Sequence, residues 1–172
     1  MKKLMSLTKE TVLYYKNGFL IAMVVYFLSI LVGIFIFHNS KIPINPKALS
    51  FLELLSHNSL SVLLVIIAGI ISFGLLGNFV LIANGIVLGR ILIGVFNNYG
   101  ISPILTNIAP HFFFETSALL MATALSYETY KLYYNIRHTE IKVIRLKYFL
   151  TGFCFIILLL VVAALIESYL GR

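Results

Sequence analysis

Residues 54–89 read LLSHNSLSVLLVIIAGIISFGLLGNFVLIANGIVLG and contain no Asp, Glu, Lys or Arg. A helix crosses the hydrocarbon core of a membrane with about 20 apolar residues. The stretch is therefore too long for one crossing, and it predicts two helices joined by a turn. Gly74-Leu75-Leu76-Gly77-Asn78 is the expected turn, because Gly and Asn adopt positive φ at little cost. We expect the two spans near 59–76 and 78–96.

The rest of the chain supplies three more apolar runs, near 18–37, 111–127 and 148–166. The composition agrees, because only 11% of the 172 residues are charged and 60% are hydrophobic. An ordinary soluble domain has about 25% charged residues, and a disordered chain combines high charge with low hydrophobicity. Both classes are excluded. The sequence predicts an all-α, polytopic transmembrane helical bundle of about five spans, with residues 1–172 forming a single integral membrane domain.

The basic residues are concentrated in two segments, 1–17 and 128–147. The first has four Lys and one Glu, and the second has five Lys or Arg and two Glu, so each carries +3. The segment 38–58 carries only +1, from two Lys and one Glu, and the segment 97–110 carries none. Short basic loops stay on the cytoplasmic side. We therefore expect the N-terminus inside, the C-terminus outside and a basic cytoplasmic helix at 128–147.

The net charge of +7 fits this topology and contact with the lipid bilayer, so no nucleic-acid partner is predicted. The tyrosines that precede the basic run recur at helical spacing, and Tyr favours the headgroup level. Two uses of the segment stay open: lying on the membrane, or docking a cytoplasmic partner. The basic residues concerned are Lys131, Arg137, Lys142, Arg145 and Lys147.

Ionisable side chains inside a membrane are costly, at about 2.5–3.5 kcal/mol each at a helix centre. Arg90, His111 and Glu115 are the candidates at such depth. The similar depths of Arg90 and Glu115 within adjacent spans predict an ion pair between them. His111 and Glu115 lie four residues apart and share a helix face, so they could also supply two ligands of a metal or proton site, which would need a third. We favour a polar network that locks helices together, and we assign no catalytic residue, no metal and no cofactor.

Three short motifs resemble the stage II sporulation protein M family of small multi-pass bacterial membrane proteins. They are His57-Asn58, the Asn84–Gly89 segment, and Pro110-His111 followed by Glu115; the resemblance covers roughly 52–126. The family has Gly after the His, where this chain has Phe112. Gly85 and Gly89 also have the small-xxx-small spacing of closely packed membrane helices. The candidate network is Asn58, Asn84, Gly85, Gly89, Arg90, Pro110, His111 and Glu115.

The resemblance implies a non-enzymatic scaffold in the bacterial plasma membrane. In spore formers, the founding member works with wall hydrolases that remodel peptidoglycan, so we expect this chain to anchor such partners during sporulation. Related members occur in gene clusters for circular bacteriocins beside an ABC-type ATPase, so export, maturation or immunity of a peptide bacteriocin is the alternative. An intramembrane metalloenzyme centred on His111 and Glu115 is a third. Self-association as a homo-oligomer is left open.

Overall fold

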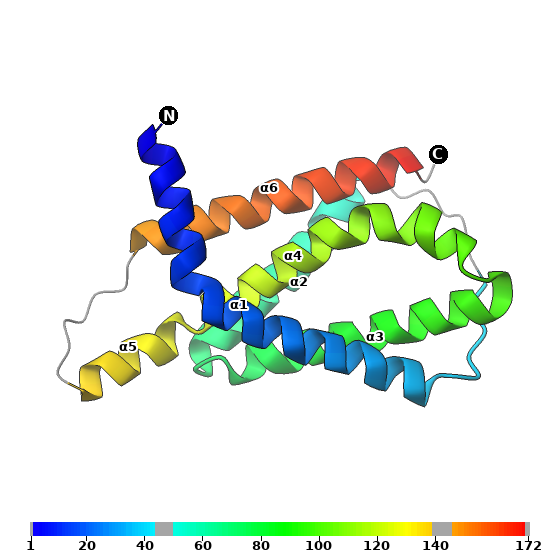
Figure 1. Cartoon of the computed structure of the whole chain (residues 1–172), viewed down its shortest axis with the longest axis horizontal. Helices are drawn as coiled ribbons and strands as arrows, with labels where there is room; N and C mark the ends of the chain where they lie inside the picture. Colours follow the sequence, from blue (N-terminus) through cyan, green and yellow to red (C-terminus); the bar gives the residue numbers. More distant parts are fainter. Residues whose placement is uncertain (1, 44–49, 139–145, 171–172) are drawn as a thin grey trace.

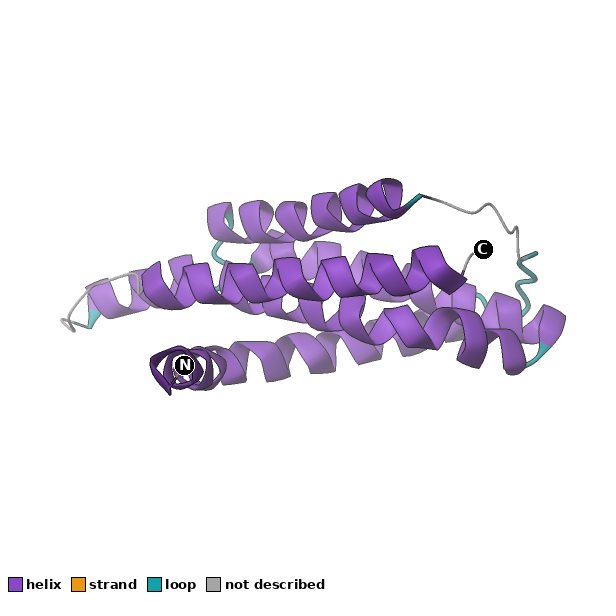
Figure 2. Cartoon of the chain, turned by 90° about the horizontal axis from the view of Figure 1, so that it is seen from above, coloured by secondary structure: helices purple, strands orange, loops and turns teal. Residues whose placement is uncertain are grey.

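Long helices make up most of the chain. The computed structural model describes residues 2–43, 50–138 and 146–170. In chain order the elements are α1 (Lys2–Ile36), α2 (Phe51–Ile71), α3 (Leu75–Tyr99), a short π-helix η1 (Ile104–Ile108), α4 (Ala109–Ser126), α5 (Glu128–Arg137) and α6 (Leu146–Leu170) (Figure 1). Figure 2 shows the long helices running side by side, with no strand among the described residues. The predicted all-α fold is confirmed.

Five helical stretches within the described ranges are long and apolar enough to cross a membrane. They are Ser6–Ile36, Phe51–Ile71, Leu75–Tyr99, Ile104–Tyr134 and Leu146–Tyr169. Their outer faces expose large apolar side chains, such as Phe35 at 81% and Leu60 at 59%. Soluble proteins rarely expose apolar surface on this scale, so these faces belong in lipid. The expected multi-pass bundle of about five spans is therefore confirmed.

The turn between α2 and α3 lies at 72–74 instead of 74–78. Phe73 has φ 56° and Gly74 has φ 93°, so the chain reverses through two consecutive left-handed residues. The Ser72 hydroxyl then accepts a hydrogen bond from the Leu76 amide at 2.8 Å, at the start of α3. Gly74 therefore ends the turn that we expected it to begin.

The second helix also begins earlier than the span expected near 59–76. Ser50 and Glu53 form a capping box, in which the Ser50 hydroxyl accepts from the Glu53 amide at 3.3 Å. The Glu53 carboxylate in turn accepts from the Ser50 amide at 2.8 Å. Such reciprocal bonds satisfy backbone donors that a helix start leaves unpaired. The polar residues before the apolar run thus belong to the helix.

The helix α4 forms the centre of the bundle. Every residue from Ala118 to Ser126 is buried, and α4 contacts α1, α2, α3 and α6. In the other membrane-spanning helices, many buried residues lie three or four positions apart, as do Thr11, Tyr15, Gly18 and Ala22 of α1. One face of each of these helices therefore packs inward, while the opposite face is left for lipid.

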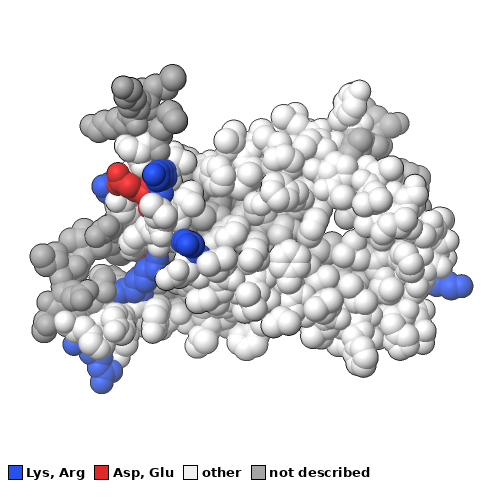
Figure 3. All heavy atoms as spheres, viewed as in Figure 1, with Lys and Arg blue, Asp and Glu red and all other residues white. Residues whose placement is uncertain are grey.

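The two ends of the bundle differ in charge. The first turns of α1, the α2–α3 turn, α5 and the start of α6 lie together on the left of Figure 1. We call this the basic end and define it by residues 6–16, 72–74, 128–138 and 146–148. On the face drawn in Figure 3, Lys and Arg gather at this end, and the middle of the face belongs to other residue types. The opposite end, the far end, comprises residues 37–43, 97–108 and 163–170.

Candidate functional site

A cavity of about 250 Å³ lies between α1, α2, α3, α4 and α6. Several polar side chains line it, although its surroundings are the apolar interior of the bundle. They are Tyr26, His57, Asn58, Ser61, Asn84, Glu115 and Thr116. Polar groups at membrane depth are expensive unless they serve a purpose. This concentration of polar groups around one cavity makes it the candidate functional site.

Glu115 is the charged residue in the wall of this cavity. It lies in the second turn of α4, and the Asn58 amide on α2 donates a hydrogen bond from Nδ2 to its Oε1. Both residues belong to the candidate network that the sequence predicts, but the bond between them was not predicted. The hydrogen bond connects α2 with α4 in the wall of the cavity.

A second group of side chains meets Glu115 beside the cavity. One potential ligand atom each from His111, Glu115 and Glu167 lies within 4.8 Å of the other two. His111 and Glu115 come from adjacent turns of α4, and Glu167 comes from the last turns of α6. All three side chains are partly buried. Such a group can hold a cation or share a proton.

No motif or spacing identifies Glu167 as a member of this group. Glu167 directly follows the apolar run near 148–166, so the sequence indicates only that it bounds that span. The predicted topology does place Glu167 at the same end of the bundle as the start of the span near 111–127. A shared end does not by itself predict a contact, because the contact depends on how α6 packs against α4.

The expected ion pair between Arg90 and Glu115 is wrong. The Arg90 guanidinium lies over the ring of Phe37 on α1's side of α3, 5.1 Å from the ring centroid. No salt bridge joins Arg90 to any acidic group in the described part of the chain. Arg90 is exposed, whereas the Glu115 carboxyl group accepts its hydrogen bond from Asn58 of α2. The two side chains therefore lie on helix faces that do not meet.

The remaining motif residues shape the surroundings of the site. The Asn84 amide donates to the Val80 carbonyl at 2.9 Å within α3, and its side chain lines the cavity. A Cβ added at Gly85 would overlap the Ser29 hydroxyl, and one added at Gly89 would overlap the Ile30 carbonyl. These two glycines therefore permit the close contact of α3 with α1. Pro110 lies in the first turn of α4.

Lys131 and Arg137, from the proposed docking residues, differ in environment. Lys131 Nζ lies over the rings of Tyr14 and Tyr15, at 4.0 and 4.6 Å from their centroids, and 3.7 Å from Glu128 Oε1. It faces α1. Arg137 is exposed and donates to the Tyr133 hydroxyl at 2.9 Å. Only Arg137 of this pair is therefore presented outward.

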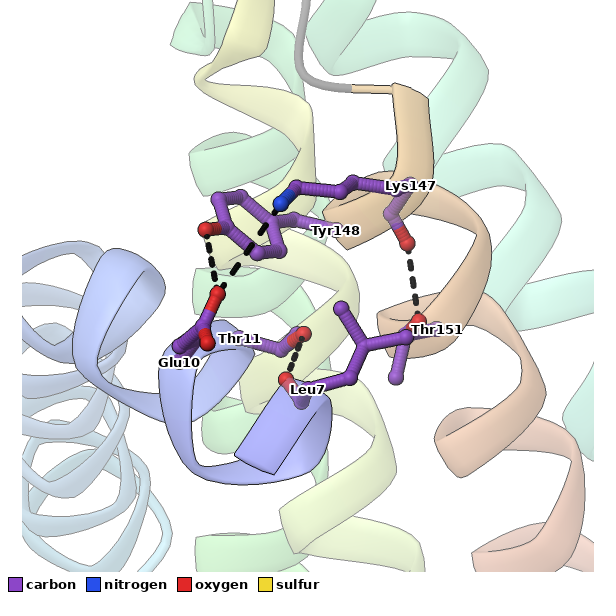
Figure 4. A network of polar contacts seen from close by, with 6 residues as sticks. All are labelled: Leu7, Glu10, Thr11, Lys147, Tyr148 and Thr151. Atoms are coloured by element: carbon purple, nitrogen blue, oxygen red, sulfur yellow. Dashed lines mark hydrogen bonds and ion pairs between the residues drawn. The ribbon is translucent and has the colours of Figure 1, made fainter. Parts of the chain in front are cut away.

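Lys147 lies in the contact between α1 and α6 that Figure 4 shows. Its Nζ is 3.9 Å from Glu10 Oε2, the same oxygen that accepts a hydrogen bond from the Tyr148 hydroxyl at 2.8 Å. Lys142 and Arg145 lie outside the described residues. The basic end therefore combines cations held against α1 with others that stay exposed.

A model of the family named stage II sporulation protein M matches residues 16–172. The match includes the cavity, the His111–Glu115–Glu167 group and the basic helix α5. No curated protein and no solved structure matches the chain.

Proposed function

Because the chain belongs to the stage II sporulation protein M family, we propose that it is a non-enzymatic scaffold in the bacterial plasma membrane, anchoring partners that remodel peptidoglycan during sporulation. Its described residues form a bundle whose helices are long and apolar enough to span a membrane. A scaffold of this kind contributes binding surfaces at the two ends of the bundle, and its partners contribute the hydrolytic chemistry.

The observation that carries the proposal is the ordered surface of the far end. The Asn97 amide donates to the backbone carbonyls of His38 and Ser40, at 2.6 and 3.0 Å. The Asn98 amide donates to the Ile42 carbonyl at 3.2 Å. These bonds hold the segment after α1 against the end of α3. A fixed surface costs little conformational entropy when a partner binds.

Apolar side chains are exposed on the same surface. Tyr99 is 48% exposed, Ile101 54% and Leu105 60%. We place this end outside the cytoplasm, because the basic segments lie at the other end and basic loops stay inside. The far end would then face the wall, where peptidoglycan hydrolases act.

Affinity purification in mild detergent tests the proposal. Tagged protein is isolated from spore-forming cells of its native host, and the co-purifying proteins are identified by mass spectrometry. We expect wall hydrolases, and we expect Leu105→Ser to reduce their recovery at least fivefold. Leu146→Ser is the matched control, because Leu146 is 59% exposed at the basic end. Absence of hydrolases, or equal recovery with both variants, would contradict the proposal.

The helix α5 favours a second function. In this function the chain works with an ABC-type ATPase in export, maturation or immunity of a peptide bacteriocin. This helix exposes Tyr130, Tyr134 and Arg137 at the basic end. Aromatic and Arg side chains are enriched in protein interfaces. The same purification distinguishes the two functions: an ATPase that is lost with Arg137→Glu and retained with Lys41→Glu at the far end would favour export.

A further inference from the structure

The His111–Glu115–Glu167 group has a composition that the scaffold proposal does not explain. It brings together one imidazole and two carboxylates, with one potential ligand atom from each within 4.8 Å of the others. A network that only locks helices together would pair opposite charges or neutral amides. Here, besides the Asn58 amide on Glu115, two carboxyl groups converge on each other.

Two carboxylates at this separation repel each other unless a cation or a proton lies between them. No Lys or Arg forms an ion pair with Glu115 or Glu167 within the ranges that the structure describes. Arg90, the basic residue expected nearby, lies over Phe37 instead. No Lys or Arg in the described part of the chain therefore neutralises this pair.

His111 has a nitrogen that is free to act as a ligand. Its Nδ1 is buried, and it has no hydrogen-bond partner among the described residues. A buried polar atom without a partner is uncommon in native proteins and calls for an explanation. A cation coordinated through this nitrogen would give it a partner, and the same cation would neutralise the two carboxylates.

Glu115 is also supported as a metal ligand should be. Carboxylate ligands are usually held by hydrogen bonds from residues one step further out. Asn58 supplies such a bond to Oε1, which leaves Oε2 available. Glu115 also lines the cavity, so a bound cation would have room for water beside it.

We propose that His111, Glu115 and Glu167 form a binding site for a divalent transition-metal ion, with Zn²⁺ as the expected occupant. Imidazole together with carboxylate is a ligand set that Zn²⁺ accepts, whereas Ca²⁺ and Mg²⁺ favour oxygen ligands alone. Zn²⁺ binds these atoms at about 2.0–2.2 Å, so the three side chains draw closer on binding. The ion fastens the start of α4 to the last turns of α6.

Zinc binding by the purified full-length chain tests this inference. The protein in detergent is stripped with a chelator, titrated with Zn²⁺ by calorimetry and analysed for metal content by mass spectrometry. We expect about one Zn²⁺ per chain. His111→Ala and Glu167→Gln should each weaken binding at least tenfold. The matched controls, His38→Ala and Glu53→Gln, change the same residue types at exposed positions and should leave binding unchanged.

Folding is checked separately. Circular dichroism should show the same helical content in Glu167→Gln as in the unaltered protein, since the substitution is nearly isosteric. Zn²⁺ should raise the melting temperature of the unaltered protein by several degrees and that of Glu167→Gln by much less. These readouts need no partner protein, so a failure here leaves the scaffold proposal standing.

Three results would overturn the inference. The first is folded, unaltered protein that binds no Zn²⁺, which would mean that the carboxylates share a proton. The second is Zn²⁺ binding that neither His111→Ala nor Glu167→Gln weakens. The third is tighter binding of Ca²⁺ than of Zn²⁺, which would remove His111 from the ligand set.

Discussion

Asn58 on α2 donates a hydrogen bond to Glu115 on α4, across the wall of the central cavity. The two residues are 57 positions apart in the chain. Their hydrogen bond links α2 to α4, the helix at the centre of the bundle. The Glu115 carboxylate is thereby fixed between an amide on one side and the His111 and Glu167 side chains on the other.

Asn58→Ala should destabilise the bundle by about 1–3 kcal/mol, because it leaves the Glu115 carboxyl group without this hydrogen-bond partner. The free energy of unfolding in mixed detergent micelles measures the effect. Asn84→Ala is the control, and it should cost less than about 1 kcal/mol, since the Asn84 amide bonds only to its own helix. Equal losses in the two variants would show that the bond to Glu115 contributes little.

Arg90→Ala should change stability by less than about 1 kcal/mol. Arg90 is exposed, and its contact with the Phe37 ring is a cation–π interaction of that order. Combining Arg90→Ala with Glu115→Gln should give the sum of the single effects within about 0.5 kcal/mol, as for independent sites. A double variant that is markedly more stable than this sum predicts would be evidence for an ion pair between Arg90 and Glu115, and it would contradict the structure.

The contrast between Arg90 and Glu115 shows which features of the protein the sequence could predict. The number of spans, their helical nature and the candidate status of Asn58, His111 and Glu115 followed from apolar run length and the cost of polar groups in lipid. Those arguments depend only on position along each helix. The partner of Glu115 depends on how each helix is rotated about its axis, and apolar runs with little amphipathicity leave that rotation undetermined.

The predicted boundaries of α2 and of the α2–α3 turn were wrong for a different reason. Ser50 and Glu53 extend α2 by a capping box, and Phe73 enters the left-handed region despite its side chain. Local hydrogen bonds decide both features. Glu167 was not predicted as a site residue, because only the packing of α6 on α4 brings it close to His111 and Glu115.

Gly85→Ala should destabilise the contact between α1 and α3 by about 1–3 kcal/mol, as overpacking does. The added methyl group would overlap the Ser29 hydroxyl. Adding Ser29→Gly should recover part of the loss, because the obstacle is a side chain. Gly89→Ala should not be recovered by Ser29→Gly, since its methyl group meets the Ile30 backbone carbonyl. Thermal unfolding of the four variants distinguishes these outcomes, and rescue of both glycine variants would contradict the packing described.

Tyr148→Phe should cost about 1 kcal/mol, the usual net contribution of a hydrogen bond. The Tyr148 hydroxyl, which belongs to a buried residue, donates to Glu10 at 2.8 Å and joins α6 to α1 (Figure 4). Lys147→Met should cost less than about 0.5 kcal/mol, because the Lys147–Glu10 pair is exposed and long at 3.9 Å. Chemical unfolding measures both values. A larger loss of stability in Lys147→Met than in Tyr148→Phe would show that the ion pair, and not the hydrogen bond, is the stronger contact with Glu10.

The direction of the bundle across the membrane can be measured with single cysteines. Cys154 is first replaced, because it is the only cysteine in the chain. Ser102→Cys then marks the far end and His138→Cys the basic end, both at exposed positions. A membrane-impermeant maleimide should label Ser102→Cys in intact cells, since basic segments stay in the cytoplasm. His138→Cys should react only after permeabilisation. The opposite pattern would place α5 outside the cell, which would contradict both the wall-facing scaffold and a cytoplasmic ATPase partner.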